Sequence, residues 1–201
     1  MRARDLMSAP VITVHPWTSA KEAAELLAAH GFTALPVVDD DRLVGIVTEA
    51  DLIRGRIPAD PRYVHEPREA TAGKTVGDLM TSPVTAMSTG TDVADLCQAL
   101  VDARIRAMPI VDGSAVVGIV TRGDIVRVLA RDDVDIARDV RHRLEIYGGG
   151  GRWGVEVQDG FVHITDQFDD DSDRHVAQLL ALAVPGVVAA ETAYAGEEQT
   201  R

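Results

Sequence analysis

The chain has 201 residues, 46% of them apolar, which is enough to bury the core of one or two domains. Its net charge is −12, and residues 129–201 carry 15 acidic against 7 basic side chains. Such a surface repels phosphate backbones, so we expect no nucleic-acid partner. No apolar run approaches the ~20 residues of a membrane helix. The single cysteine, Cys97, cannot form an internal disulfide, and we expect a cytoplasmic protein.

The N-terminal residues predict a strand, a helix, two further strands and a second helix. A short β-branched run at 11–14 precedes a helical stretch, which Ser19 begins as an N-cap and Gly31 ends. The runs LPVV and LVGIV are separated by the polar residues DDDR, which predicts a hairpin. After Thr48, the residues EADLIR return to helical spacing.

The same plan returns 73 residues later. A shift of 73 positions aligns Asp5–Arg54 with Asp78–Arg127 without a gap. The matched segments include DLMSAPV with DLMTSPV, ALPVVD with AMPIVD, and VGIVTEADLIR with VGIVTRGDIVR. A register of this length indicates a duplicated unit. Because each copy alone leaves an apolar face exposed, we expect the two copies to pack around a pseudo-two-fold axis.

The doubled signature resembles the CBS (cystathionine-β-synthase) domain, which occurs in tandem pairs called Bateman modules. The resemblance covers residues 3–54 and 76–128, where P(V/I)VD is followed by GIVTxxD. It implies an α+β fold of β-α-β-β-α repeats that binds an adenosyl ligand in the cleft between them. Typical ligands are AMP, ADP, ATP, S-adenosylmethionine and related dinucleotides. We expect the first repeat at 1–54, a linker at 55–75 and the second repeat at 76–130.

The polar ending of each GIVTxxD motif is chemically suited to a ribose and its phosphate. A carboxylate accepts hydrogen bonds from both ribose hydroxyls, which is the role predicted for Asp51 and Asp124. Thr48 and Thr121 end buried strands, where a hydroxyl donates to a phosphate or ribose oxygen beside a helix N-terminus. The alternative is that these residues only cap the helix that follows.

Three further residues are expected near the base. We expect adenine to lie against the backbone at Val37 and Ile110, where main-chain groups can pair with its edge. The family resemblance also places Thr13 near the base. The second copy has Ala86 at that position, so the two halves of the cleft are not equivalent.

The two copies also differ in charge near the expected phosphate. Arg106 occupies a position where relatives often carry a basic side chain that contacts phosphate, and Arg122 follows the threonine of the second motif. Their counterparts in the first copy are Thr33 and Glu49. Because phosphate favours arginine and avoids a carboxylate, we expect the second half of the cleft to suit a phosphorylated ligand better. The open alternative is that both arginines are solvated surface residues.

Residues 129–201 do not continue the repeat. A helix around Val140, a hairpin centred on Asp159-Gly160, a second helix and a final strand give the order αββαβ. This order, with a PGV step before the last strand, resembles a small α/β BON (bacterial OsmY and nodulation) domain over residues 134–195. The resemblance implies association with a protein partner or a membrane surface. The acidic charge argues against simple attraction to anionic lipid.

No arrangement of residues predicts catalysis or metal binding. The segment GGGGRWG contains a formal G-x-G-x-x-G, but it follows a helix and opens a strand, the reverse of a dinucleotide-binding loop. The six histidines are scattered rather than placed at metal-ligand spacing. We therefore expect no cofactor, no metal and no enzymatic activity.

The sequence predicts a regulatory protein in which an adenine nucleotide in the CBS cleft shifts the conformation that a partner recognises. The alternative is an interaction scaffold whose CBS pair dimerises without any physiological ligand. We expect a homodimer through the CBS pairs, because the helices carry more apolar residues than the repeat core needs. The expected contributors are Leu52, Ile53, Ile125, Val126 and Leu129.

Overall fold

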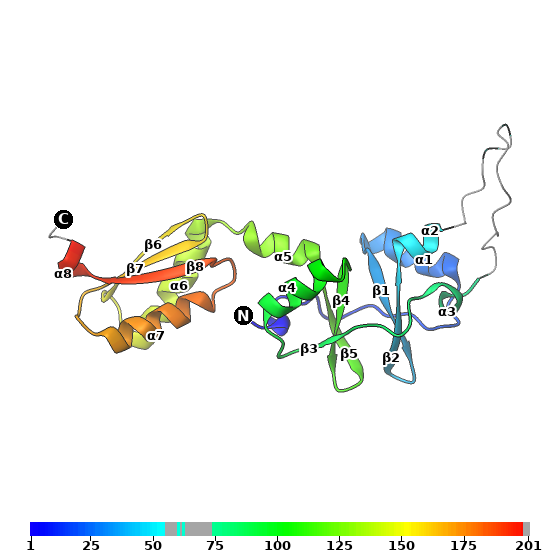
Figure 1. Cartoon of the computed structure of the whole chain (residues 1–201), viewed down its shortest axis with the longest axis horizontal. Coiled ribbons are helices and arrows are strands. Elements are labelled where there is room, and N and C mark those ends of the chain that lie inside the picture. The colour runs from blue at the N-terminus through cyan, green and yellow to red at the C-terminus, as the bar shows by residue number, and fades with distance from the viewer. Residues whose placement is uncertain (55–59, 61, 63–73, 199–201) are drawn as a thin grey trace. The chain divides into compact units, whose positions relative to one another are not determined.

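The computed structural model describes residues 1–54, 60, 62 and 74–198 and divides into two compact units. Residues 2–122 form the N-terminal unit, which contains the first copy of the repeat and the second copy up to its last helix, and the C-terminal unit begins at Gly123 (Figure 1). Most of the linker expected at 55–75 lies outside the described residues. No helix in the described part of the chain is long and apolar enough to cross a membrane.

The first copy folds as η1 (Ala3–Asp5), α1 (Ala20–His30), β1 (Ala34–Asp39), β2 (Arg42–Thr48) and α2 (Glu49–Ile53). Strands β1 and β2 form the predicted antiparallel hairpin. The predicted ends of α1 are confirmed, since the Ser19 hydroxyl accepts the Glu22 N–H at 3.1 Å and Gly31 is left-handed at φ 66°. The strand expected at 11–14 is reduced to a single parallel bridge between Val14 and Val37.

The second copy repeats this plan with one more regular strand. Its elements are α3 (Val76–Leu79), β3 (Met87–Ser88), α4 (Val93–Asp102), β4 (Ala107–Asp112) and β5 (Ala115–Thr121). The sheet has the order β3-β4-β5, with β3 parallel and β5 antiparallel to β4. Because β1–β2 and β4–β5 have the same register, the duplication read from the sequence is confirmed in the fold.

The core of the first copy is completed by residues of the second. Val76, the first residue of α3, has no exposed surface and packs with Leu35 and Val47 of the first hairpin. Close by, Ile46 and Thr81 exchange main-chain hydrogen bonds of 3.1 and 2.8 Å. The first repeat therefore needs a segment that follows it in the chain to bury its apolar face.

The second copy is completed in the same way by the N-terminal segment. Ala3, the counterpart of Val76, is fully buried, and its N–H donates to the Thr91 carbonyl at 2.9 Å. Ser8 and Ile119 exchange main-chain hydrogen bonds of 2.9 and 3.2 Å. The exchange between copies is reciprocal, as a pseudo-two-fold arrangement requires.

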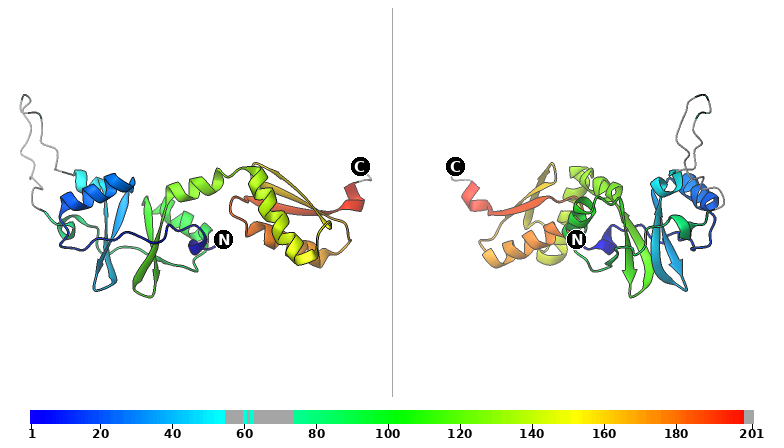
Figure 2. Two further views of the ribbon diagram at one scale, coloured as in Figure 1. Left: turned by 180° about the vertical axis from the view of Figure 1, so that it is seen from behind. Right: turned by 45° about the vertical axis from the view of Figure 1, so that its right-hand side comes forward.

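The two hairpins lie side by side within the N-terminal unit (Figure 2). Ala34, Ile46 and Ala107 form a buried cluster, against which Val84 and Ile119 pack. Small side chains at this contact let the strands approach closely, so residues here hold the two copies together rather than face solvent.

Each hairpin also has a glycine where another segment presses on the strand. A methyl group added at Gly45 would lie 2.5 Å from Met80 Sδ, and one added at Gly118 would lie 2.5 Å from Met7 Sδ. Met80 and Met7 are themselves equivalent positions in the 73-residue register. At both strands a larger residue would therefore force the methionine of the exchanged segment to move.

The C-terminal unit has the predicted order αββαβ. Its elements are α6 (Asp133–Gly148), β6 (Trp153–Gln158), β7 (Phe161–Asp166), α7 (Asp171–Leu182), β8 (Ala189–Tyr194) and the short α8 (Ala195–Glu198). The sheet order is β6-β7-β8, with β6 antiparallel and β8 parallel to β7. Asp159 and Gly160 have φ of 50° and 76°, which confirms the predicted hairpin turn. Helices α6 and α7 cover one face of the sheet (Figures 1 and 2).

An arginine joins the start of β6 to the end of β7 and to α7. Arg152 donates two hydrogen bonds of 2.8 Å to the fully buried Asp166 carboxylate and one of 2.6 Å to Asp173. Its guanidinium carbon lies 4.3 Å from the centre of the Trp153 ring. Burial would raise the pKa of Asp166, but the bonds from Arg152 and from the Phe168 N–H outweigh it and hold that pKa below its usual value.

Helix α5 (Arg122–Leu129), expected as the last helix of the second repeat, groups with the C-terminal unit from Gly123 onward. Just beyond its end, Arg131 donates hydrogen bonds of 2.6 Å to both the Pro185 carbonyl and the Asp139 carboxylate. These bonds fix the end of α5 to α6 and to the loop after α7. The boundary between the units therefore falls within the second GIVTxxD motif.

Candidate functional site

The first GIVTxxD motif forms a closed hydrogen-bonded turn between β2 and α2. Asp51 Oδ2 accepts the Thr48 N–H at 2.9 Å and the Thr48 hydroxyl at 2.7 Å. This is a capping box, so the cap expected as the alternative to ligand binding is present. Asp51 Oδ1, however, makes no hydrogen bond or ion pair within the described residues. The half-buried carboxylate can therefore cap α2 with one oxygen and accept from a ribose with the other.

The second motif holds its carboxylate differently. Asp124, in the first turn of α5, is only 7% exposed, and its Oδ1 accepts a hydrogen bond of 2.8 Å from Arg127. The Arg127 side chain is 77% exposed, so this ion pair is screened by water and weak. Asp124 Oδ1 is therefore engaged in an ion pair, whereas Asp51 Oδ1 makes no such bond within the described part of the chain.

The two arginines expected near a phosphate have different surroundings. Arg122 Nη2 donates a hydrogen bond of 2.7 Å to the Leu100 carbonyl, one of the last carbonyls of α4. Arg122 therefore caps the C-terminus of α4, a role that the sequence did not suggest. The Arg106 side chain is exposed, and its carbonyl accepts the Arg122 N–H at 3.1 Å. Arg106 is thus the arginine with its charge directed to solvent.

The residues expected against the base lie inside the sheets. The side chains of Val37 and Ile110 have no exposed surface. Val37 lies between its partners on β2 and at Val14, and Ile110 lies between β5 and β3. Both residues therefore have a neighbouring segment on each side of their strand, and the hairpin register shifts directly after each of them. Thr13 is half-buried beside Val14 and keeps partly exposed surface near this strand.

The structure brings the two threonines of the motifs to one face of the N-terminal unit. Thr48 is paired with Ala34 across the first hairpin, and Thr121 is paired with Ala107 across the second. Ala34 and Ala107 belong to the same buried cluster between the copies. Thr48 and Thr121 therefore flank the contact between the two hairpins, and Arg106 adjoins it.

The helices of the N-terminal unit carry exposed apolar side chains, and one of these lies beside a hollow. A depression of about 300 Å³ lies between α1 and α2, where Ile53 is 59% exposed. Val101 at the end of α4, a position that sequence reasoning missed, is 64% exposed. Leu52, expected at a dimer surface, is instead 5% exposed and packs in the core of the first copy. Helical spacing alone did not show which side of α2 faces inward.

The remaining residues expected at a dimer surface lie on α5. Val126 and Leu129 are 62% and 63% exposed, and Ile125 is half-buried. Their exposure agrees with the expected apolar surface. Because α5 groups with the C-terminal unit, these residues belong to a different unit from Ile53 and its hollow.

Comparison with known proteins identifies the N-terminal unit. The family model for the CBS domain matches residues 3–57 and 76–131, which together exceed half of the chain. The chain belongs to the CBS-domain family. The two copies are therefore called the first and second CBS repeats below, and together the CBS pair.

Individual relatives cover the CBS pair. The chloroplastic CBS domain-containing protein CBSX2 of Arabidopsis thaliana is 35% identical over 134 residues, 57% of this chain and 56% of the relative. The chain thus spans little more than half of the length of that relative. A solved structure of CBSX2 in complex with AMP has a TM-score of 0.52 at 33% identity and covers 63% of this chain and 93% of that one.

A second solved structure has the same kind of ligand. The CBS domain pair of protein MJ0100, in complex with 5′-methylthioadenosine and S-adenosyl-L-methionine, has a TM-score of 0.53 at 32% identity. It covers 64% of this chain and 94% of its own. The ligands in both structures, AMP in one and 5′-methylthioadenosine with S-adenosyl-L-methionine in the other, are compounds built on adenosine.

Proposed function

We propose that the CBS pair binds an adenine nucleotide and relays its presence by conformational change to a partner. The observation that carries this proposal is the Thr48–Asp51 turn, in which Oδ2 caps α2 and Oδ1 remains as an acceptor for a ribose hydroxyl. The complexes of CBSX2 with AMP and of MJ0100 with adenosine compounds support it. The role is regulatory rather than catalytic, and the chain needs no cofactor for it.

The relay follows from where the second motif lies. Asp124 is on α5, and Arg131 fixes the end of α5 to Asp139 and the Pro185 carbonyl. The polypeptide that carries the second motif therefore continues directly into a helix that is anchored to α6. A nucleotide bound to the CBS pair shifts a conformational equilibrium only as far as it prefers one conformation over another.

The central experiment compares two aspartates that make the same cap. In α3, Asp78 Oδ2 accepts the Thr75 N–H at 2.8 Å and the Thr75 hydroxyl at 3.0 Å, which repeats the geometry of Asp51 outside the motif. Calorimetric titration with AMP and with 5′-methylthioadenosine should show binding weakened by Asp51→Asn and unchanged by Asp78→Asn. Loss of a charge-assisted bond is worth about 1.5–3 kcal/mol of binding free energy. Equal affinities in both variants would reduce the motif to a helix cap.

The expected phosphate contact has its own test at Arg106. The Arg106→Ala change should weaken AMP and leave 5′-methylthioadenosine, which lacks a phosphate, unchanged. Arg106 is preferred to Arg122 because removal of Arg122 also removes the cap of α4. An equal effect on both compounds, or on neither, would count against a phosphate at this position and would leave ribose recognition by Asp51 intact.

We further propose that the CBS pair forms a homodimer through its helices. The exposed Ile53 beside the hollow between α1 and α2 supports this, since exposed apolar patches of this kind mark association surfaces. Light scattering should give a dimer mass that Ile53→Glu converts to a monomer. If the dimer forms while no adenosine compound binds, the scaffold role replaces the sensor role.

The C-terminal unit is proposed to be a BON-like module, on the support of its αββαβ order. A reducing, cytoplasmic setting is proposed because Cys97 is the single cysteine and cannot form an internal disulfide. Burial and the nearby charge of Asp92 raise the pKa of its thiol, as is usual for a structural cysteine.

A further inference from the structure

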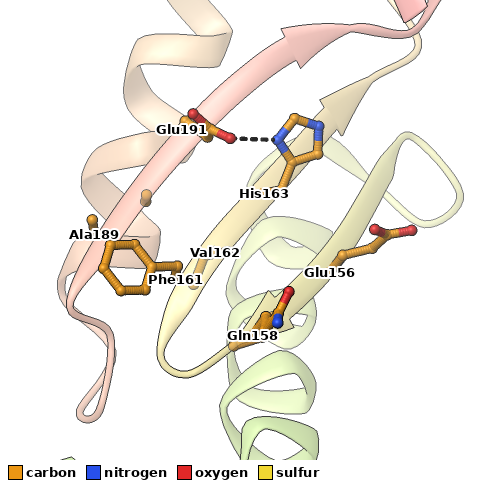
Figure 3. Close-up of a pocket in the computed structure, with 9 residues that line it drawn as sticks. Glu156, Gln158, Phe161, Val162, His163, Ala189 and Glu191 are labelled. Atoms are coloured by element: carbon orange, nitrogen blue, oxygen red, sulfur yellow. Dashed lines mark hydrogen bonds and ion pairs between the residues drawn. The ribbon is translucent and has the colours of Figure 1, made fainter.

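Among the described residues of the C-terminal unit, helices α6 and α7 pack on one face of the sheet around the buried core, and no helix of this unit packs on the other. The uncovered face, here called the open sheet face, holds a hollow of about 590 Å³ over β6, β7 and β8 (Figure 3). Its principal side chains belong to Glu156, Gln158, Phe161, His163, Ala189 and Glu191. A sheet face that presents apolar surface is normally covered by another layer of structure. The open sheet face is therefore a candidate surface for binding a partner.

The open sheet face has an apolar end and an acidic centre. Phe161, next to the hairpin turn, is 58% exposed, and its neighbour across β8 is Ala189. Two residues further along β7, His163 is flanked by Glu156 on β6 and by Glu191 on β8. His163 Nδ1 lies 3.1 Å from Glu191 Oε1, and the Glu191 side chain is 79% exposed. Two strand residues separate the apolar and acidic rows by about 7 Å.

The negative charge of the open sheet face limits the kind of partner that can bind there. A phosphate-bearing surface, whether nucleic acid or anionic lipid, would be repelled by Glu156 and Glu191. A second copy of the chain is disfavoured too, since residues 129–201 carry 15 acidic against 7 basic side chains. A partner that carries both an apolar side chain and a positive charge can contact the apolar row and the acidic row of the face at once.

We propose that the open sheet face docks a basic amphipathic helix of a partner protein. An apolar side chain of that helix packs on Phe161 and Ala189, and a lysine or arginine four residues away lies above His163 and pairs with Glu156 or with the exposed Glu191. Residues four apart on a helix are about 6 Å apart along its axis, close to the spacing of about 7 Å between the two rows. The surface is separate from the nucleotide site, and the proposal does not depend on nucleotide binding.

The test uses the full chain and a fluorescent helical peptide of leucine and lysine, followed by anisotropy and by amide chemical shifts. Shift changes are expected at Phe161, His163 and Ala189. The double change Glu156→Lys with Glu191→Lys should weaken binding about tenfold, and Phe161→Ala should weaken it as well. The same double change should create binding to a matching peptide of leucine and glutamate.

The control variant has the same net charge but leaves the open sheet face intact. Glu145→Lys with Asp95→Lys changes two exposed carboxylates elsewhere and should bind the lysine peptide nearly as tightly as the wild type. Melting temperatures of all variants identify any loss of folding. Equal weakening by both double variants would overturn the proposal, because binding would then follow net charge alone. Shift changes confined to α6, α7 or the CBS pair would overturn it too.

Discussion

In the N-terminal unit, the buried side chains of the described residues 2–54 and 74–122 are apolar, whereas the two buried carboxylates of the described chain, Asp124 and Asp166, belong to the C-terminal unit. Each repeat completes its core with a segment of the other, so apolar burial is enough to hold the pair. The C-terminal unit has no second copy, and it ties a glycine-rich turn to its sheet with the ion pairs of Arg152. One region should therefore respond to side-chain volume and the other to charge.

The largest effect is expected from Arg152→Met, which leaves the Asp166 carboxylate buried and unpaired. Removing one partner of a buried ion pair costs about 3–5 kcal/mol in the free energy of unfolding. Urea unfolding followed by Trp153 fluorescence, with Trp17→Phe in the background, reports on the C-terminal unit alone. The matched control is Arg138→Met. Arg138 forms an exposed ion pair with Asp135, so this change should lower the free energy of unfolding by less than about 1 kcal/mol. Equal losses in the two variants would contradict a charge-dependent core.

Acid should distinguish the units without mutation. Hydrogen bonds from Tyr147 and Arg152 hold the pKa of Asp173 below its usual value. Burial raises the pKa of Asp166, but its hydrogen bonds from Arg152 and the Phe168 N–H outweigh this effect and lower that pKa too. A carboxyl whose folded pKa is depressed adds stability above its unfolded pKa of about 3.9, and this is lost as the pH falls through the folded value. The C-terminal unit should therefore lose stability below about pH 4. Hydrogen exchange that showed the CBS pair opening first on acidification would refute this order.

In the CBS pair, removing buried side-chain volume should lower the free energy of unfolding more than removing a charge does. Val76→Ala removes two methyl groups from the exchanged segment in the core of the first repeat and should cost about 2 kcal/mol. Val101→Ala on the exposed end of α4 is the control and should change stability by less than about 0.5 kcal/mol. Chemical denaturation of both variants measures the difference, and similar values would mean that the exchange contributes little.

The smallest expected difference lies between two equivalent glycines. A methyl group at Gly45 meets the Thr81 main-chain oxygen at 3.0 Å as well as Met80, whereas the three atoms nearest to one at Gly118 all belong to the Met7 side chain. Side chains can move aside more easily than backbone, so Gly45→Ala should be the more destabilising by about 1 kcal/mol. Thermal melts of the paired variants would decide it, and the reverse order would show that the first repeat is the more adaptable one.

Local patterns in the sequence were sufficient for much of the fold. The repeat, the hairpins, the Ser19 cap, the Gly31 end and the Asp159-Gly160 turn all depend on residues a few positions apart, and all are confirmed. The Thr48–Asp51 pairing could also be read from the sequence, because a spacing of three residues places both groups in one helical turn.

Contacts between residues far apart in the sequence could be seen only in the tertiary structure. The exchange of Val76 and Ala3, the cap of α4 by Arg122 and the pairing of Arg152 with Asp166 join residues that no short pattern relates. The same holds for the candidate site, where burial of Asp124 distinguishes it from Asp51 although both stand in the same motif. A sequence specifies local hydrogen bonds through spacing, whereas exposure and long-range pairing arise only when separate segments pack against one another.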